Sequence, residues 1–429
     1  MKQVIKKKII NKHNLTTEEP ILTVLFDMNS VMKMALVDKR INGKGEEYGM
    51  VFQTLILMKK ILKMRSWNFV YGMYDGYNSG ILRYNLYGDY KMNRGKNYDL
   101  NSVPKTDYEK YIDEYCKRVI AYSQKKRRQK EVVRNESEEE NFNRQREIIF
   151  SCLEELFIRQ VICDNVEGDD LIAYYCKNKK PNEKILIVSG DRDLTQLIND
   201  DICVYAIQLR KTITKDNAIE HLGHTQENVV LKKIICGDVS DNIVGIKGIG
   251  ETTFFQLFPE AKASKMDICD IIERSKVLNE ERIHNKKKPL KSLENIINRV
   301  TDGCQGEHIY EINKKIIDLS EPMVTDDAKE ELDNLMHAPL DPDGRDYKNL
   351  YQIVLNNDMG DIISENKFST FFSDFNQLIE NEKKYFKKSQ NPSESLNRLL
   401  IFYLKKICQK GKLYISLHCM RVTKYLLNY

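Results

Sequence analysis

Three apolar runs that end at or just before an acidic residue constrain the fold of this 429-residue chain most strongly. The runs and the acids that follow them are Ile21–Phe26 with Asp27, Phe69–Tyr74 with Asp75, and Ile185–Val188 with Asp191. Short apolar runs of this kind are typical of strands buried on both faces of a parallel sheet. The segment Glu46–Arg65 has helical spacing, as a βαβ crossover requires. The sequence therefore predicts an α/β domain with a mostly parallel central sheet flanked by helices.

Acidic residues gather at the predicted strand ends and in later motifs. They are Asp27, Asp75, Glu167, Asp169, Asp170, Asp191, Asp193, Asp238 and Asp241. Ligands of open α/β sheets bind beyond the carboxyl ends of strands, so the acids that follow three strands should converge on one rim. Hard divalent cations with oxygen ligands relieve the repulsion between such carboxylates. Two Mg²⁺ or Mn²⁺ ions roughly 4 Å apart are the usual device for in-line attack on a phosphodiester.

The acidic motif Val166-Glu167-Gly168-Asp169-Asp170 directly precedes an apolar run. It therefore occupies the first turn of a predicted helix, where the helix dipole favours negative charge. Helix capping explains one of these acids but not three.

A glycine-rich turn follows the last two acids. The segment Gly245-Ile-Lys-Gly248-Ile-Gly250 leads into Glu251-Thr252-Thr253, which is typical of a helix start. Glycines let backbone N–H groups approach phosphates closely, and a helix N-terminus supplies positive potential. The sequence therefore predicts metal chemistry and nucleic-acid binding in adjacent segments.

The charge distribution fits a polyanionic ligand. The net charge is only +5, but the basic residues cluster in runs such as Lys125–Arg128 and Lys286–Lys288. Separate basic patches beside an acidic pocket suit a polyanion held by its backbone, although each run could instead be a solvated face. Ten cysteines without a Cys-x-x-Cys motif favour free thiols in a reducing compartment. We expect a protein without a signal peptide or a membrane span.

The ordered motifs resemble the 5′-nuclease superfamily, which comprises flap endonucleases and the 5′→3′ exonuclease domains of bacterial DNA polymerases. The similarity is greatest to the phage-encoded ribonuclease H and 5′→3′ exonuclease branch, and it covers roughly residues 20–370. The matching elements are Asp27, Asp75, Arg83 with Tyr87, Tyr90-Lys91-Met92-Asn93-Arg94, Glu167–Asp170, Ser189–Leu197 and Gly237–Gly250. The resemblance implies a PIN-like sheet, a helical arch, and a smaller C-terminal helical region with a helix-hairpin-helix element.

The resemblance also implies a site for two Mg²⁺ ions, with Mn²⁺ as a substitute. The implied ligands of the first ion are Asp27, Asp75, Glu167 and Asp169, with Asp170 assisting. Those of the second are Asp191, Asp193 and Asp241, with Asp238 acting through water or tuning the site.

Lys91 and Arg94 are the implied contacts of the scissile phosphate, where phosphoryl transfer needs positive charge. They would face the same way on a helix. The resemblance assigns Arg83 to support or to DNA contact, and it implies a K⁺ ion at the glycine turn. The remaining implied nucleic-acid contacts are Tyr87, Tyr90, Lys125, Lys126, Arg127, Arg128, Gly245, Lys247, Gly248, Gly250 and Thr252.

The predicted organisation has four parts. They are a polar lead-in (1–20), a nuclease domain (21–210) with a helical arch at about 97–147, a helical DNA-binding region (211–372) and a basic extension (373–429). The arch would pass a single-stranded 5′ end, with base stacking on its tyrosines. A solvated helical hairpin is the alternative. The extension could bind DNA or a replication protein, or it could be a packing appendage.

We expect a monomeric, cytoplasmic, metal-dependent 5′ nuclease of a phage that removes RNA primers or 5′ flaps. Its partners would be flapped DNA or RNA–DNA hybrids and single-stranded-DNA-binding or other replication proteins. A PIN-type ribonuclease is one alternative, but it would not need the glycine hairpin. A non-catalytic junction-binding protein is the other, but it would lack several of the acids. Asn29 disfavours an aspartyl-phosphate enzyme, and the chain has no P-loop.

Overall fold

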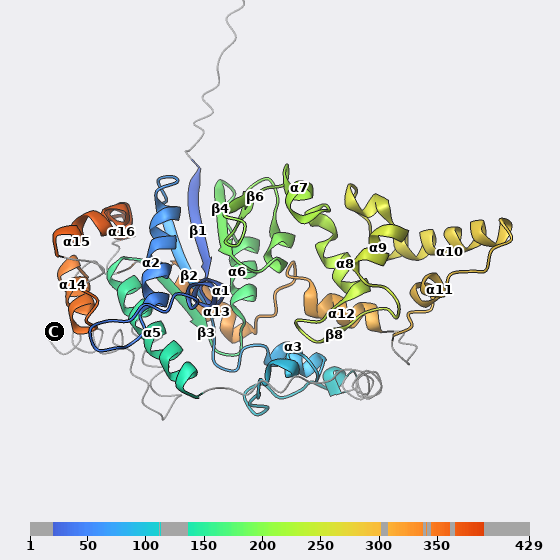
Figure 1. The fold of residues 1–429 in the computed structure, drawn as a ribbon, viewed down its shortest axis with the longest axis horizontal. Coiled ribbons are helices and arrows are strands. Elements are labelled where there is room, and N and C mark those ends of the chain that lie inside the picture. Colours follow the sequence, from blue (N-terminus) through green and yellow to red (C-terminus); the bar gives the residue numbers. More distant parts are fainter. Residues whose placement is uncertain are drawn as a thin grey trace, which may run out of the picture.

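A six-stranded sheet forms the centre of the computed structural model, which describes residues 20–110, 112, 136–301, 308–337, 340, 345–360 and 365–389 (Figure 1). The strands are β1 (Ile21–Asp27), β2 (Phe69–Asp75), β3 (Arg159–Cys163), β4 (Glu183–Ser189), β5 (Ile202–Ala206) and β6 (Lys211–Ile213). Their order is β3-β2-β1-β4-β5-β6, and only β6 is antiparallel to its neighbour. The predicted mostly parallel sheet is confirmed.

The register of the sheet brings the ends of the central strands to one edge. Asp27 at the end of β1 pairs with Met73 of β2, while Phe26 pairs with Val188 of β4. Asp75, Asp27 and Ser189 therefore end neighbouring strands at the same carboxyl edge. The three predicted apolar runs form the neighbouring strands β1, β2 and β4, whose carboxyl ends meet at this edge.

Helices cover both faces of the sheet because successive side chains of a strand point to opposite sides. Val24 and Phe26 face a core shared with one helical layer, while Leu25 faces the other core. The first layer contains α1 (Met28–Ala35), α2 (Gly49–Leu62), α5 (Glu136–Glu155), α14 (Tyr347–Asn356), α15 (Glu365–Phe372) and α16 (Asn376–Ser389). The second contains α6 (Gly168–Lys177) and α13 (Asp326–His337).

A separate helical core lies beyond β6 and α7 (Ala218–Leu222), on the right of Figure 1. Its elements are α3 (Ile81–Leu86), α8 (Val229–Cys236), the two-residue strands β7 (Gly237–Asp238) and β8 (Ile243–Val244), α9 (Glu251–Leu257), α10 (Ile268–His284), α11 (Lys291–Ile297) and α12 (Ile309–Ile317). Phe254 and Phe258 are fully buried in this core. Tyr87 and Tyr90, which follow α3, join the same core, so the segment after β2 packs with the helical part.

The chain returns from α12 to the sheet before it ends. Leu332 of α13 packs on the sheet, and Phe372 and Leu378 pack with α2 on the other face. The proposed division at residues 210 and 372 stays a prediction, and this packing indicates that α13 to α16 belong with the α/β domain.

Several predicted segments lie outside the described residues. These are most of the lead-in (1–19), the basic run Lys125, Lys126, Arg127 and Arg128 of the predicted arch, and residues 390–429 of the extension. Of the predicted arch, residues 97–110 and 112 and the first part of α5 are described. Within the described part of the chain, no helix has the length and apolar character needed to cross a membrane.

A buried ion pair joins β3 to α16. The Arg159 guanidinium pairs with the Glu382 carboxylate, with Nη2 donating to Oε2 at 3.0 Å, and both side chains are less than 5% exposed. This pair explains why β3 begins with a charged residue and does not form a continuous apolar run.

We predict that Glu382→Ala lowers the free energy of unfolding by on the order of 3 kcal/mol, because it leaves the Arg159 charge buried without its carboxylate. Urea unfolding followed by circular dichroism measures the change. Glu380→Ala removes an exposed glutamate from the same helix and should change stability little. Equal stabilities of the two variants would contradict a stabilising role for the buried pair.

Candidate functional site

Asp27 is fixed at the centre of the carboxyl edge of the sheet. It ends β1 and caps α1, because its Oδ1 accepts a hydrogen bond from the Ser30 N–H at 3.0 Å. Its Oδ2 accepts from the Ser189 hydroxyl at 2.6 Å, which fastens the end of β4 to β1. Burial raises the pKa of Asp27 to about 6, and the negative charges of Asp75 and Asp191 contribute to the rise.

Three further carboxylates surround Asp27. Asp75 Oδ1 accepts a hydrogen bond from the Gly168 N–H at 2.8 Å, which brings the end of β2 to the start of α6. Burial raises the pKa of Asp169 well above its usual range, and the charges of Asp27 and Asp191 add to this effect. We call Asp27, Asp75, Asp169 and Asp191 the first carboxylate group. Strand register and these hydrogen bonds place Asp27 and Asp75 at the same edge of the sheet, as predicted.

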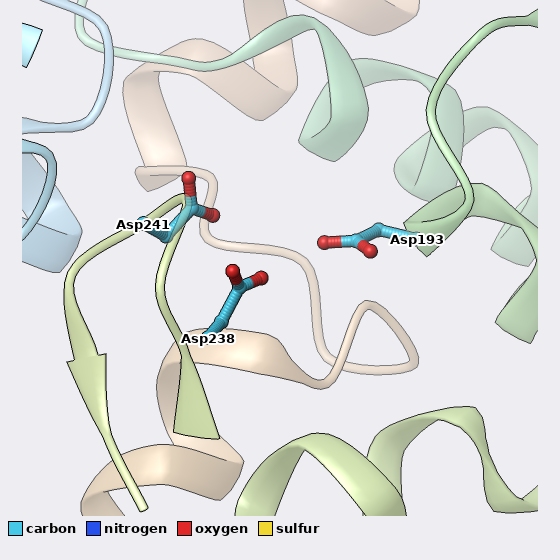
Figure 2. A group of neighbouring side chains, drawn as sticks. All are labelled: Asp193, Asp238 and Asp241. Carbon is cyan, nitrogen blue, oxygen red and sulfur yellow. The ribbon is translucent and has the colours of Figure 1, made fainter. Parts of the chain in front are cut away.

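A second carboxylate group consists of Asp193, Asp238 and Asp241. One carboxylate oxygen from each lies within 4.8 Å of the others (Figure 2). Asp193 begins a 3₁₀ turn (Asp193–Leu197) after β4, whereas Asp238 and Asp241 come from β7 and the turn before β8. Burial raises the pKa of Asp193 to about 6, and the charge of Asp191 adds to the rise.

Lys233 of α8 lies between two members of this second group, and sequence reasoning missed it. Its Nζ donates to Asp193 and, at 2.5 Å, to Asp238 Oδ2. Burial disfavours the ionised form of Asp238, but Lys233 and Ser240 outweigh it and lower its pKa to about 2. The available signal was a lysine pair inside the apolar helix segment Val-Val-Leu-Lys-Lys-Ile-Ile, directly before the acids.

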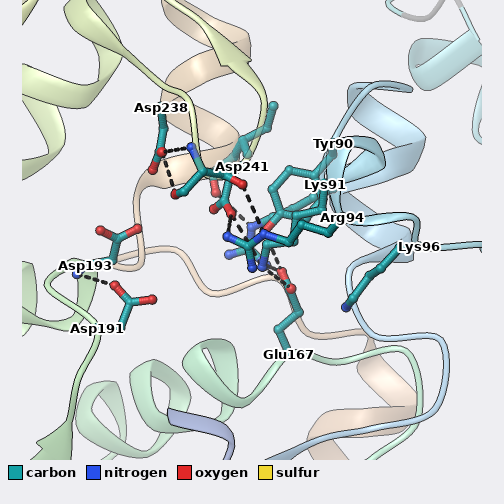
Figure 3. A network of polar contacts seen from close by, with 12 residues as sticks. Tyr90, Lys91, Arg94, Lys96, Glu167, Asp191, Asp193, Asp238 and Asp241 are labelled. Atoms are coloured by element: carbon teal, nitrogen blue, oxygen red, sulfur yellow. Dashed lines mark hydrogen bonds and ion pairs between the residues drawn. The ribbon is translucent and has the colours of Figure 1, made fainter. Parts of the chain in front are cut away.

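Glu167 is the meeting point of the cations on the other side of the site (Figure 3). Lys91 Nζ donates to its Oε1 at 2.6 Å, while Arg83 Nη1 and the Tyr90 hydroxyl each donate to its Oε2 at 2.9 Å. Burial opposes ionisation of Glu167, but the charges of Lys91 and Arg83 outweigh it and lower the pKa of this carboxyl.

Lys91 and Arg94 converge through a turn, because the helix α3 ends at Leu86. Lys91 has a left-handed backbone with φ 53° and precedes the short 3₁₀ turn Met92–Arg94. Arg94 Nη2 donates to Asp241 Oδ1 at 2.6 Å, and Lys91 Nζ lies 3.9 Å from the same oxygen. The two cations therefore connect Glu167 with the second carboxylate group.

Arg83 and Asp170 form a buried pair behind the rim. Arg83 Nη2 donates to Asp170 Oδ1 at 2.9 Å, and Arg83 Nε donates to the Ile316 carbonyl at 2.8 Å. Asp170 also accepts a hydrogen bond from the Met323 N–H. Its carboxylate is therefore engaged by Arg83 and Met323 and is not part of either carboxylate group. This geometry favours the supporting role for Arg83 over DNA contact.

Tyr87 and Tyr90 are 0% and 2% exposed in the helical core. Both tyrosines were expected to contact nucleic acid. Their side chains instead pack inside this core, and the Tyr90 hydroxyl donates a hydrogen bond to Glu167. Both side chains fit this core because it is lined by large apolar residues of α8 and α12.

The glycine turn follows Asp241 and β8 in the chain. A Cβ on Gly245 would lie 2.2 Å from the Cys236 carbonyl carbon, so only glycine allows this contact. Gly248 has φ +81°, which favours glycine, and its position is open to solvent. Lys247, Gly248, Gly250 and Thr252 are all exposed around the start of α9. The helix-hairpin-helix assignment stays a prediction.

Comparison with known proteins identifies the α/β part. Residues 23–223 match the family described as "5'-3' exonuclease, N-terminal resolvase-like domain". This region belongs to the 5′-nuclease superfamily. The 5'-3' exonuclease of Bacillus subtilis (strain 168) is 36% identical over 110 residues, which are 25% of this chain and 37% of that protein. The thermostable DNA polymerase I of Thermus caldophilus is 34% identical over 122 residues, 28% of this chain and 14% of that protein.

The chain spans less than two-fifths of the length of either of these two relatives. A solved structure of T5 5'-exonuclease with bound divalent metal ions (zinc) has a TM-score of 0.48 and 15% identity. That comparison covers 83% of this chain and 99% of the T5 chain.

We predict that the metal-free protein loses stability between about pH 4 and pH 6. Asp27 and Asp193 have pKa values near 6, above the usual 3.8, so the folded protein holds protons that the unfolded chain releases. Their contribution to stability is complete at low pH and is lost as the pH rises through 6. The melting temperature in EDTA should therefore fall over this interval, and added Mg²⁺ should reduce the fall.

Differential scanning fluorimetry measures this dependence. Asp27→Asn should flatten the pH dependence, whereas Asn at the exposed Asp200 should leave it unchanged. A melting temperature in EDTA that rises from about pH 4 to pH 6 would contradict the assignment.

Proposed function

We propose that this protein is a divalent-metal-dependent, structure-specific 5′ nuclease that hydrolyses phosphodiester bonds near single-strand/double-strand junctions. The observation that carries the proposal is the rim where both carboxylate groups meet, bordered by Lys91 and Arg94 and by the glycine turn. The superfamily of residues 23–223 supports the same conclusion.

The residues at the rim fit hard divalent cations. They offer carboxylate oxygens, which Mg²⁺ and Mn²⁺ prefer, and three of these oxygens lie within 4.8 Å of one another. Lys233 already places positive charge between Asp193 and Asp238, which supports a cation at this position. We assign Mg²⁺, with Mn²⁺ as a substitute, to the first and second carboxylate groups. Such ions activate water and neutralise charge at a reacting phosphate when they are bound.

The distribution of ligands differs from the expectation drawn from the resemblance. Asp238 groups directly with Asp193 and Asp241, whereas Asp191 influences the ionisation of Asp27 and Asp169. Asp238 is thus proposed as a direct ligand of the second ion, and Asp191 as a residue of the first group that borders the second.

Lys91 and Arg94 supply fixed positive charge to the scissile phosphate in this proposal. Burial would lower the pKa of Lys91, but Glu167 and the hydroxyl of Tyr90 outweigh it and raise the pKa well above its usual range. Lys91 therefore stays protonated and can stabilise the charge that develops on non-bridging oxygens. Arg83 holds Glu167, which in turn orients Lys91.

The exposed turn at Lys247–Thr252 is proposed to hold the duplex backbone, with a K⁺ ion at the turn. The substrates proposed are 5′ flaps and RNA primers in phage replication, with the basic run Lys125–Arg128 guiding the single strand. The PIN-type ribonuclease and the non-catalytic binding protein have less support. The first would not need the glycine turn beside Asp241, and the second would not need both carboxylate groups intact.

We predict Mg²⁺-dependent cutting of a 5′-labelled flap duplex and of an RNA-primed duplex near the junction, with no cutting in EDTA. Asp193→Ala should slow the reaction by roughly two orders of magnitude or more, because it removes a carboxylate of the second group. Asp200→Ala, a change at an exposed aspartate of the same loop, is the matched control and should cut normally. Normal cutting by Asp193→Ala would contradict the two-ion site, and tight junction binding without cutting by the unaltered protein would favour the binding-protein alternative.

We also predict that Lys91 and Gly248 affect different steps. Lys91→Ala should reduce kcat more than it weakens binding of flap DNA in Ca²⁺, because its charge acts at the scissile phosphate. Gly248→Ala should weaken binding more than kcat, since φ +81° strains an alanine in the turn. Single-turnover kinetics and fluorescence anisotropy separate the two effects. Equal losses in both variants would contradict this division of roles.

A further inference from the structure

Lys96 reaches the site from the segment that follows Lys91 and Arg94. Its amino group is turned toward Glu167, on the side of that residue away from Asp193 and Asp238 (Figure 3). Lys96 Nζ donates to the carbonyl oxygen of Ser79 at 3.2 Å and to its hydroxyl at 3.3 Å. Two contacts to neutral oxygens thus hold the ammonium group beside the rim.

Four other cations at the site are compensated by carboxylates. The pairs are Arg83 with Asp170, Lys91 with Glu167, Arg94 with Asp241, and Lys233 with Asp193 and Asp238. Among the residues that the structure describes, no carboxylate lies within ion-pair distance of Lys96. Lys96 is therefore a site cation whose charge remains available to a ligand.

The chemistry of Lys96 favours an anionic oxygen ligand. An ammonium group has three donors, and Ser79 accepts from it with two oxygens, so one donor remains. Burial lowers the pKa of Lys96, and the neighbouring charges of Lys91 and Lys33 act in the same direction, against the attraction of Glu167 and Asp75. An anion bound beside the amino group would counter both the burial and the repulsion from Lys91 and Lys33, and would thereby favour the charged form of Lys96.

We propose that Lys96 binds a non-scissile phosphate of the strand that is cut, beside the phosphate that Lys91 and Arg94 contact. The proposal rests on the proposed nuclease function. Lys91 and Arg94 contact Asp241 and face the second carboxylate group, whereas Lys96 lies beyond Glu167. The two sets of cations are thus placed to hold successive phosphates of one strand and not a single phosphate.

Binding of flap DNA in Ca²⁺, measured at several salt concentrations, tests this role. Lys96→Gln should lower the slope of log Kd against log salt by about 0.7 to 0.9, the value for one lost phosphate contact. Lys96→Arg keeps the charge and should preserve the slope. Lys184→Gln removes an exposed lysine from β4 at the opposite edge of the sheet and should also leave it unchanged.

A scan with single methylphosphonate linkages then locates the contact. At one position the neutral linkage should weaken binding by the unaltered protein roughly tenfold, as expected for a lost charge-assisted hydrogen bond, and should not weaken Lys96→Gln further. An unchanged salt slope, or equal effects of every linkage on both proteins, would overturn the proposal.

Cleavage by the unaltered protein separates this inference from the proposed function. If the unaltered protein fails to cut flap DNA with Mg²⁺, the nuclease function and the role of Lys96 both fail. If it cuts normally and Lys96→Gln keeps the full salt slope, only the role of Lys96 fails.

Discussion

Repulsion between carboxylates at the carboxyl edge of the sheet is the constraint on which the rest of this structure depends. Burial and mutual charge raise the pKa of Asp27 and Asp169, so the fold gathers acids that would separate in water. The backbone of the sheet holds them together, since Asp27 and Asp75 end paired parallel strands. Burial and repulsion both disfavour the ionised carboxylates at this rim. The rim therefore suits divalent cations, whose charge would stabilise the ionised acids.

Fixed cations balance part of this charge and connect the two cores. Lys233 of α8 binds Asp193, which follows β4, and Arg94 binds Asp241. Arg83 links Asp170 at the start of α6 to the carbonyl of Ile316 in α12. The electrostatic requirements of the rim therefore also hold the helical part against the α/β domain. Removal of a single carboxylate leaves a buried or half-buried cation without its partner, which generally costs more than the pair contributes.

The sheet and the membership of the site were largely predictable. The apolar runs identified β1, β2 and β4, and strand-end logic placed Asp27 and Asp75 at one edge. The strands β3, β5 and β6 were not predicted. Arg159 begins β3 only because Glu382, more than 200 positions later, neutralises it. The pairing of Lys91 with Arg94 was expected on a helix face, but a left-handed turn at Lys91 produces it.

The sequence by itself determined which residues could carry the chemistry, because strand period and the position of acids after apolar runs are local properties of the chain. Only the tertiary structure decided which of these acids lie together and which cations pair with them. It grouped Asp238 with Asp193, buried Tyr87 and Tyr90, and placed Lys233 and Lys96 at the site. These outcomes depend on contacts between α8, the segment after β2 and the end of β4, which are distant in the chain. Charge compensation acts through space, and no local pattern records which cation neutralises which acid.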